Sequence, residues 1–338
     1  MDNELFISRF DSVGLMKKIA VVGAGFAGLS VCYHLLKRGG LVTLFDRKGI
    51  GGGTSGIASG LLHPYPGEVA RLSWRGEEAM REARHLLSVA GADVYQENGI
   101  LKVAVTSKQE SALHKLAKRY QDVKWLEKEG AGYFFSKEGR ALPVAMIQSG
   151  ITVHASLYLQ KLWEVCERLG AQFEKKGVFL DMLDPFDCVV LAVGGGIREF
   201  PIVKKLNLRF NKGQLLLCQK PIEWNIDTSF IGKGYLASSE SHPFCFLGST
   251  YERNFNSEKP CMKSATDLIF KQLSQFFPPF HSFLIEKCMA GMRVVNPHGP
   301  YPILKKLSDK VFIVTGMGSR GLLYHGLIGK EVAEEILL

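Results

Sequence analysis

The sequence predicts an α/β fold with two domains, one built on a doubly wound parallel sheet and the other rich in antiparallel strands. Three observations predict it. A glycine-rich turn joins a short apolar strand to a helix near the start of the chain. Further strands that end in glycines follow, and short apolar runs separated by turn residues lie between these parts. In addition, 338 residues are more than one simple core accommodates.

The first of these features is the segment KKIAVVGAGFAGLSVCYHLLKRGGLVTLFDRK, residues 17–48. Its first apolar run is rich in β-branched residues, and residues 26–36 place apolar side chains at helical spacing. The glycines between them fit the pattern G-x-G-x-x-G, in which the first permits a tight turn, the second admits a pyrophosphate and the third packs the helix on the strand. The turn that we expect to hold a nucleotide pyrophosphate consists of Gly23, Ala24, Gly25, Phe26, Ala27 and Gly28.

An acidic residue follows the second apolar run of this segment. Asp46 lies 18 residues after Gly28, where a carboxylate can accept hydrogen bonds from a ribose and disfavours a 2′-phosphate. Arg47 comes next and is included in the predicted nucleotide site. The glycine pattern alone would indicate only a strand, a turn and a helix, so the order of strand, helix, second strand and acid carries the prediction.

The rest of the chain alternates between two patterns. A loop of small residues, GIGGGTSGIASGLLHPYPG, precedes a charged helix from about residue 74 to 89, and a strand, GILKVAVTS, precedes the lysine-rich helix SKQESALHKLAKRY. Helical spacing returns over residues 157–169, and the apolar strand FDCVVLAVGGG ends in glycines, as expected at the crossing point of a doubly wound sheet. GQLLLCQ, GYLASSE and FCFLGSTYE predict an antiparallel sheet, and the chain ends in strand, glycine turn and helix.

These patterns predict a discontinuous nucleotide-binding domain that a second domain interrupts twice. We expect the nucleotide-binding domain to comprise residues 16–85, 146–203 and 286–338, and a substrate domain to comprise residues 86–145 and 204–285.

Composition and charge exclude some classes of protein. No run of 18 or more apolar residues predicts a membrane span, and the first fifteen residues do not resemble a signal peptide. The seven cysteines are scattered without C-x-x-C spacing, which argues against a disulfide framework and against a metal site and favours the reducing cytoplasm. The net charge of +9 makes a polyanionic partner possible, although a solvated basic surface explains it equally well.

The order of the motifs resembles that of the FAD-dependent D-amino acid oxidase and glycine oxidase family. Within it, the chain is most similar to the oxidase domain of the bifunctional tRNA 5-methylaminomethyl-2-thiouridine biosynthesis protein. The motifs that carry the resemblance are GAGFAG, GTSGIASGLLHP, VVLAVGG, KGQLL, GYL, GSTYE, GMR and GMGSRGL, which together cover nearly the whole chain from Lys17. The resemblance implies non-covalently bound FAD rather than a nicotinamide cofactor.

The resemblance also assigns cofactor-binding residues. A loop that passes over the pyrophosphate and along the isoalloxazine matches Thr54, Ser55, Gly56, Ala58, Ser59, Gly60 and Leu61. Val178, in an expected strand, matches the position whose backbone meets the adenine, and small residues beside the nucleotide match Ala192, Gly194 and Gly195. The turn near the pyrimidine edge of the flavin matches Gly316, Gly318, Ser319, Arg320, Gly321 and Leu322.

Three residues match positions that carry the substrate chemistry. Arg293 matches an arginine that grips an amino acid carboxylate, Tyr235 a tyrosine that binds the same carboxylate, and Arg320 a second arginine at the boundary of flavin and substrate. A structural ion pair and a half-buried strand tyrosine are the alternatives for Arg293 and Tyr235. His63 lies beside the flavin loop, but one histidine establishes neither a base nor a ligand.

Two departures from the family pattern concern the end of the chain. Relatives commonly have a basic residue, an acid and then a proline after GxR, whereas the segment GMRVVNPHGPYPIL has His298 and Gly299 near the place of the acid and an extra residue before Pro302. Cys288 precedes the position at which related sarcosine oxidases attach flavin covalently. The effect of the altered segment on the substrate pocket stays open.

The resemblance implies oxidation of the C–N bond of a glycine-like amine. The leading substrate is the carboxymethylaminomethyl group of a tRNA wobble uridine, and the alternative is a free small amino acid, namely glycine, sarcosine or a D-amino acid. A non-catalytic flavin-binding protein is a third hypothesis. The electron acceptor, oxygen or a quinone, and the oligomeric state are not predicted.

Overall fold

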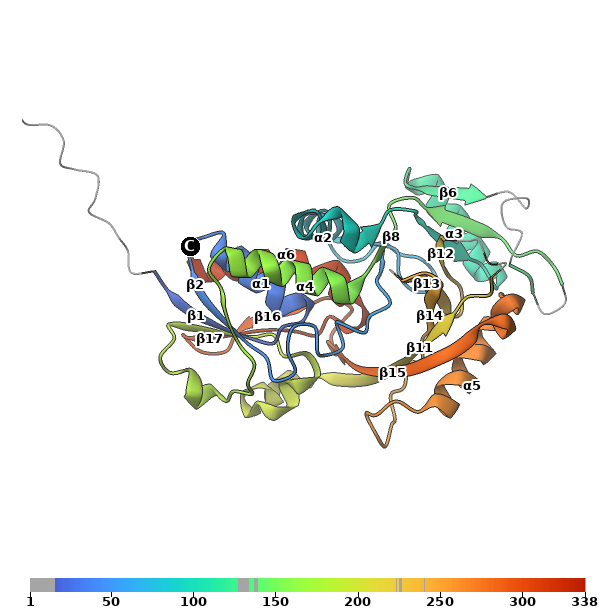
Figure 1. Ribbon diagram of the computed structural model, residues 1–338. Helices are drawn as coiled ribbons and strands as arrows, with labels where there is room; N and C mark the ends of the chain where they lie inside the picture. Colours follow the sequence, from blue (N-terminus) through green and yellow to red (C-terminus); the bar gives the residue numbers. More distant parts are fainter. Residues whose placement is uncertain are drawn as a thin grey trace, which may run out of the picture.

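The computed structural model describes residues 16–126, 134–136, 139–222, 224, 227–239 and 241–337 (Figure 1). In this part of the chain the strands form a six-stranded, an eight-stranded and a three-stranded sheet. The two larger sheets lie at opposite ends of the molecule, and helices α1, α4 and α6 lie together over the smaller of the two (Figure 1). None of the helices in the described part combines the length and apolar character that crossing a bilayer requires.

The six-stranded sheet begins with the predicted glycine-turn unit. Its strand order is β16 (Ile303–Lys306), β17 (Val311–Thr315), β10 (Cys188–Leu191), β1 (Lys18–Val22), β2 (Leu41–Phe45) and β9 (Gln172–Glu174). All pairs are parallel except the pair of β16 with β17. The chain leaves β1 toward β2 on one side and returns to β10 on the other, so the carboxyl ends of β1 and β10 form the crossing point at which such sheets bind ligands.

Helices cover one face of this sheet. α1 (Phe26–Leu36) packs on α6 (Gly321–Leu337) and on α4 (Ala155–Arg168), and α2 (Gly76–Ala90) packs outside them (Figure 1). α1 is buried on nearly all sides, which explains its almost wholly apolar sequence. Three short 3-10 segments cover the opposite face: η3 (Leu180–Leu183), η4 (Gly194–Glu199) and η5 (Pro201–Leu206).

The eight-stranded sheet joins the two parts that we assigned to the substrate domain. Its order is β15 (Leu284–Val295), β11 (Arg209–Gln219), β14 (Phe244–Gly248), β13 (Tyr235–Ser238), β12 (Ser229–Ile231), β5 (Ile100–Val103), β7 (Val144–Ile147) and β6 (Val123–Leu126). α5 (Met262–Leu273) and η6 (Pro278–Ser282) cover one face with a cluster of phenylalanines. α3 (Ser107–Arg119), capped by Thr106, packs near β6.

The strand register assigns polar side chains to the other face of this sheet. One row of directly opposite residues runs across six strands: Lys102, Ile231, Tyr235, Gly248, Leu215 and Met289. Directly opposite residues project from the same face of a sheet. Arg293 lies on this face too, because it is four residues after Met289 on β15. The neighbouring rows, with Leu101, Phe230 and Leu236, face the phenylalanine cluster.

A short three-stranded sheet connects the two ends of the molecule. It consists of β3 (Leu61–Leu62), β8 (Ile151–Val153) and β4 (Tyr95–Gln96), with η1 (Ala92–Val94) before β4. β3 comes directly after the predicted flavin loop, so this sheet holds the end of that loop.

The predicted fold class is confirmed, and one local expectation is wrong. Val178 does not lie in a strand but in the connection between β9 and η3, where its side chain is buried in an apolar cluster with Phe45 and Leu183. A lone valine between turn residues has no period that distinguishes the two cases. The domain boundaries stay a prediction. β15, which begins at Leu284, spans the predicted boundary at residue 286.

Candidate functional site

The glycine turn has no room for side chains at two of its three glycines. Gly23 has a φ of +108°, and a Cβ on it would lie 2.4 Å from the carbonyl oxygen of Ala192 at the end of β10. A Cβ on Gly28 would lie 1.7 Å from the carbonyl oxygen of Gly23. The first and third glycines therefore allow β1, α1 and β10 to approach one another, as the pattern predicts.

The carboxylate of Asp46 ties the end of β2 to this turn. Its Oδ2 accepts a hydrogen bond from the backbone N–H of Ala24 at 2.9 Å, and its Oδ1 accepts one from that of Lys48 at 2.7 Å. Oδ1 also accepts from the N–H of Gly49 at 3.2 Å, whereas Oδ2 keeps a lone pair that can still accept a ribose hydroxyl. Arg47 forms two hydrogen bonds with the exposed carboxylate of Glu199, at 2.6 and 2.8 Å, which directs it along the surface beside Gly196.

The loop of small residues lies against the start of α1. Ser55 Oγ accepts a hydrogen bond from the N–H of Phe26, the first residue of α1, at 3.2 Å. Thr54 Oγ1 accepts from the N–H of Met292 at 3.0 Å and donates to its carbonyl oxygen at 3.2 Å, which fastens the loop to β15. Further along, Gly60 has a φ of +79°, and a Cβ on it would lie 1.8 Å from the carbonyl oxygen of Val153. The hydroxyls of this loop therefore fasten it to α1 and β15, whereas Gly60 is needed because a side chain has no room there.

The glycine turn near the end of the chain brings a second helix start beside the first. Gly316 and Gly318 have φ values of +77° and +56°, and α6 begins directly after the turn at Gly321. A Cβ on Gly321 would lie 3.9 Å from the ring of Phe26, so α1 and α6 start side by side. Free N–H groups and helix dipoles make both starts favourable for negative charge.

The other predicted cofactor residues fall in this region or close to it. Ala192, Gly194 and Gly195 follow β10, and a Cβ on Gly195 would lie 3.0 Å from Met292 Cβ. Gly56 has no room for a Cβ, which would lie 2.0 Å from the carbonyl oxygen of Gly51. The backbone of Ala58, Ser59 and Leu61 continues the loop into β3. Ser319 and Leu322 lie in the turn and in the first part of α6.

Arg293 is held in place by the strand edge beside it. Its Nη1 donates to the carbonyl oxygen of Thr250 and its Nη2 to Ser249 Oγ, both at 2.9 Å. The guanidinium lies over Gly213, where a Cβ would be 2.3 Å from its central carbon, and 5.7 Å from the ring centre of Tyr251. The structural ion pair that we considered for Arg293 is not present among the described residues. Because two of its five N–H groups point at these acceptors, the remaining ones can bind a carboxylate.

Tyr235 approaches the same strand end. A Cβ on Gly248 would lie 2.4 Å from the hydroxyl of Tyr235, so the tyrosine ring covers that glycine. Arg293 contacts the two residues that follow Gly248. The structure thus brings together the predicted carboxylate-binding pair at residues 248–250, although Tyr235 and Arg293 lie on different strands and are 58 residues apart in the sequence.

Arg320 lies at the turn before α6 and carries an unsatisfied donor. Its Nη1 donates to the carbonyl oxygen of Pro300 at 2.9 Å, whereas its buried Nε has no hydrogen-bond partner. The altered segment around His298 therefore holds this arginine through Pro300. His298 itself is exposed, and its N–H donates to Asn296 Oδ1 at 3.0 Å.

Two basic groups next to this region add to the site. Lys102, which is buried on β5, was not predicted from the sequence, and His63 was predicted to lie beside the flavin loop without a role. His63 Nδ1 accepts from the N–H of Tyr65 at 3.2 Å. Burial, with the positive charges of Lys102 and Arg320, lowers the pKa of His63 to about 3, so this imidazole is neutral at physiological pH. A lysine within the apolar strand GILKVAV was the sequence signal for Lys102.

These residues fit an FAD molecule. A dinucleotide suits the two helix starts that lie side by side, the glycines without room for a Cβ and the acid after β2. A flavin gains negative charge on reduction, and the Nε of Arg320, which has no hydrogen-bond partner, could donate to it. Cys288 lies on the opposite face of the eight-stranded sheet, where its thiol packs in the phenylalanine cluster, so it does not reach this site.

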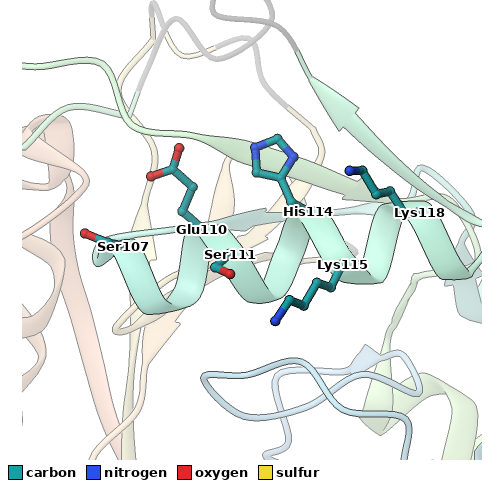
Figure 2. A pocket seen from close by; sticks show the side chains of 6 residues that line it. All are labelled: Ser107, Glu110, Ser111, His114, Lys115 and Lys118. Carbon is teal, nitrogen blue, oxygen red and sulfur yellow. The ribbon is translucent and has the colours of Figure 1, made fainter.

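The surface has a hollow elsewhere, along α3. Figure 2 shows its lining, which comes from one helix only: Ser107, Glu110, Ser111, His114, Lys115 and Lys118. His114 and Lys118 point to one side of the helix and Lys115 to the other (Figure 2). The ring of His114 stacks on Trp125 at 3.6 Å. A hollow on a single exposed helix cannot enclose a flavin, so it is not part of the cofactor site.

Comparisons with known proteins agree with this geometry. The family model for FAD dependent oxidoreductases matches residues 18–335. The glycine oxidase of Bacillus licheniformis is 24% identical, over 97% of this chain and 93% of its own length. The tRNA 5-methylaminomethyl-2-thiouridine biosynthesis bifunctional protein MnmC of Maricaulis maris is 24% identical over 94% of this chain, which spans only 52% of that protein.

Solved structures show the same fold. Iminodiacetate oxidase from Chelativorans sp. BNC1 superposes with a TM-score of 0.79 at 18% identity, covering 94% of this chain and 95% of its own. Glycine oxidase from Bacillus cereus superposes with a TM-score of 0.76 at 17% identity, covering 95% and 94%. The match of nearly the whole chain to the family model, on a fold with paired helix starts and glycine turns, shows that this protein belongs to the FAD-dependent oxidoreductase family.

Proposed function

We propose that the enzyme oxidises the C–N bond of an amine that carries a carboxymethyl group. The observation that carries the proposal is the convergence of Arg293 and Tyr235 at residues 248–250, on the sheet face that also contacts the flavin loop. Gly291, on the same face, would place a Cβ 2.6 Å from Thr54 of that loop. A carboxylate at Arg293 would therefore bind close to the cofactor.

The residues of the chain bind and orient the substrate. The guanidinium of Arg293 forms charge-assisted hydrogen bonds with the carboxylate, and the Tyr235 hydroxyl adds one more donor. Bound FAD supplies the chemistry by accepting the hydride, and the imine product then hydrolyses. The apolar and cationic surroundings favour the neutral form of the substrate amine, which is the form that can lose a hydride.

The leading carrier of the carboxymethyl amine is the wobble uridine of tRNA. Two observations support it: the net charge of +9, and the exposed basic side chains on the sides of α3 and on β6, namely Lys108, Lys115, Lys118, Arg119 and Lys124. Such a surface attracts phosphates. MnmC relatives are also similar over nearly the whole chain. A cytoplasmic location, where tRNA is available, belongs to the same proposal.

A free small amino acid is the second candidate, and a specific observation favours it. The glycine oxidase of Bacillus licheniformis matches over 93% of its own length, whereas the MnmC relatives are much longer than this chain. In that case the basic surface of α3 is only solvated. A flavin-binding protein without turnover is disfavoured by the carboxylate-binding pair.

An anaerobic flavin-bleaching experiment distinguishes the two candidates. We expect tRNA with the carboxymethylaminomethyl group to reduce the flavin faster than glycine, sarcosine or D-alanine, and added salt to slow the reaction. Nucleoside mass analysis should then show the aminomethyl product. An unchanged nucleoside, together with full bleaching by a free amino acid, makes the second candidate the function. No bleaching by any carboxymethyl amine would refute the proposal.

A further inference from the structure

Lys102 is a buried cation without a carboxylate partner. Its side chain is 6% exposed, and its Nζ donates one hydrogen bond, to the carbonyl oxygen of Tyr65 at 3.4 Å. Among the described residues it forms no ion pair, and burial is the cause of its lowered pKa. By contrast, Lys220, which is 5% exposed, pairs with Asp227 at 3.4 Å. Buried charges are normally paired, so Lys102 is a buried cation for which the described part of the chain provides no anion.

Among the described residues, the groups that contact Lys102 and its neighbour His63 carry no negative charge. Tyr65 links it to His63: the carbonyl of Tyr65 accepts from Lys102, and its N–H donates to His63 Nδ1. Because Nδ1 is the acceptor, the proton of the neutral His63 is on Nε2, which has no partner in the described structure. Arg320, the other charged group near His63, is also a cation. Burial lowers the pKa of Lys102 to about 8, so the ammonium form predominates at neutral pH.

Lys102 projects from the same sheet face as the carboxylate-binding pair. Lys102 is directly opposite Ile231 on β12, and Ile231 is directly opposite Tyr235 on β13. Two strand spacings separate Lys102 from Tyr235, about 10 Å between their main chains. The Tyr235 hydroxyl lies over Gly248 on β14, one strand farther from Lys102, so three strand spacings, about 15 Å, separate that hydroxyl from the main chain of Lys102. The extended lysine side chain and one small dicarboxylate together span this distance. A substrate carboxylate at Arg293 and Tyr235 therefore leaves Lys102 within reach of a second anionic group of the same molecule.

We propose that Lys102, together with His63 Nε2–H, binds a second carboxylate of the substrate. The proposal rests on the proposed oxidation of a carboxymethyl amine and names the class of free substrate that the pocket prefers, an imino- or amino-dicarboxylate. Arg293 and Tyr235 bind the carboxylate next to the oxidised carbon, and Lys102 binds the carboxylate on the other substituent of the nitrogen. Lys102 is thus the residue that determines specificity between substrates with one and with two carboxylates.

Binding of two sulfur analogues tests this without turnover. Thiodiacetate carries two carboxylates and methylthioacetate one, and neither has a C–N bond to oxidise. Their dissociation constants for the FAD-loaded protein are measured by calorimetry and by the flavin difference spectrum. We expect thiodiacetate to bind at least about 10-fold more tightly, as a charge-assisted hydrogen bond typically provides. Lys102→Met should abolish that difference by weakening thiodiacetate alone, and Lys102→Arg should retain it.

The control is Lys220→Met, which removes a buried lysine that already has a carboxylate partner and should leave both constants unchanged. Equal affinity of the wild-type protein for the two analogues overturns the proposal, and this result does not depend on any variant folding. An equal loss of affinity for both analogues in Lys102→Met overturns it too. If the midpoint potential of the flavin is also lowered in that variant, the charge of Lys102 stabilises the reduced cofactor and not a substrate carboxylate. Preserved thiodiacetate preference without bleaching by iminodiacetate or by any other carboxymethyl amine would refute the proposed function but not this subsite.

Discussion

The two sheets present different chemistry to the centre of the molecule. At the six-stranded sheet, the proposed cofactor contacts are backbone N–H groups at two helix starts and glycines without room for a Cβ. At the eight-stranded sheet, the proposed substrate contacts are long side chains, namely Arg293, Tyr235 and Lys102. A backbone site depends on shape, whereas a side-chain site depends on charge. The first therefore suits one invariant cofactor, and the second can be changed one residue at a time.

The largest expected effect tests the shape-dependent side. Gly28→Ala would place a Cβ 1.7 Å from the carbonyl oxygen of Gly23, so β1 and α1 must separate. We expect a loss of stability of about 3 kcal/mol or more and little bound FAD. Thermal unfolding and the ratio of flavin to protein absorbance after desalting measure both. Gly53→Ala is the control, because a Cβ there has nothing within 4 Å. Normal FAD content in Gly28→Ala would contradict the account of the turn.

The next effect tests the charge-dependent side. Arg293→Ala should cost about 2–5 kcal/mol of substrate binding, because it removes a charged partner of the carboxylate, with FAD content near normal. Steady-state or flavin-reduction kinetics should show a rise in the substrate constant of about 30-fold or more. Arg293→Lys should recover only part, since lysine lacks the fork geometry. Arg198→Ala, which removes an exposed arginine paired with Glu258, is the control. An unchanged substrate constant in Arg293→Ala would leave that arginine a structural role only.

A smaller effect concerns a histidine under the helix starts. His325 is fully buried, and its ring nitrogens contact the Tyr158 hydroxyl at 2.6 Å and the Leu322 carbonyl oxygen at 2.7 Å. Burial lowers its pKa from 6.5 to about 4. The unfolded chain therefore binds a proton that the folded chain does not, and stability is complete above pH 6.5 and falls as the pH drops toward 4.

His325→Gln should flatten this dependence. At pH 5, we expect protonation of the unfolded state to cost the wild type about 2 kcal/mol through this residue, and the variant should not lose this amount. Denaturant unfolding at pH 7 and pH 5 measures the difference. An identical loss in both proteins would show that other groups account for the acid sensitivity, such as His34 on α1, whose pKa burial lowers to about 3.

The smallest effect concerns a charge at the edge of the shape-dependent side. Arg47 and Glu199 are about half exposed, so their ion pair should contribute about 0–1 kcal/mol to stability. Arg47→Ala should retain FAD with an affinity within about 10-fold of the wild type, because backbone contacts dominate that site. Equilibrium binding of FAD to the apoprotein measures this. A loss of FAD affinity as large as that in Gly28→Ala would show that a side-chain charge, and not only backbone shape, controls binding at the six-stranded sheet.

The same contrast explains what could be predicted from the sequence. Gly23 and Gly28 could be predicted from the sequence because the turn leaves no room for a side chain at either position. Glycine is therefore required at fixed spacing within a short segment. Tyr235 and Arg293 could be predicted only through the family resemblance, since their meeting at residues 248–250 depends on the register of distant strands. That register is a tertiary property without a local period.

Two errors have a common cause. Lys102 was missed because a single lysine in an apolar strand is expected to face solvent. Only the pairing of β5 with β12 shows that it is buried on the sheet face that carries Tyr235 and Arg293. Val178 was assigned to a strand although it lies in a connection, because one apolar residue has no period. In both cases the missing information was which elements pack together.

β15 has a consequence for how this protein can vary in length. Along one face of this strand, Gly291 contacts the flavin loop and Arg293 reaches the substrate side, while Val295 bridges to Met317 in the turn before α6. One inserted residue between 289 and 295 would turn these contacts to the opposite face. Residues 253–260 are largely exposed and can absorb insertions. The number of residues between Gly291 and Val295 therefore fixes the distance between the proposed cofactor and substrate sites. We expect natural or engineered insertions in exposed loops such as residues 253–260, and not within β15.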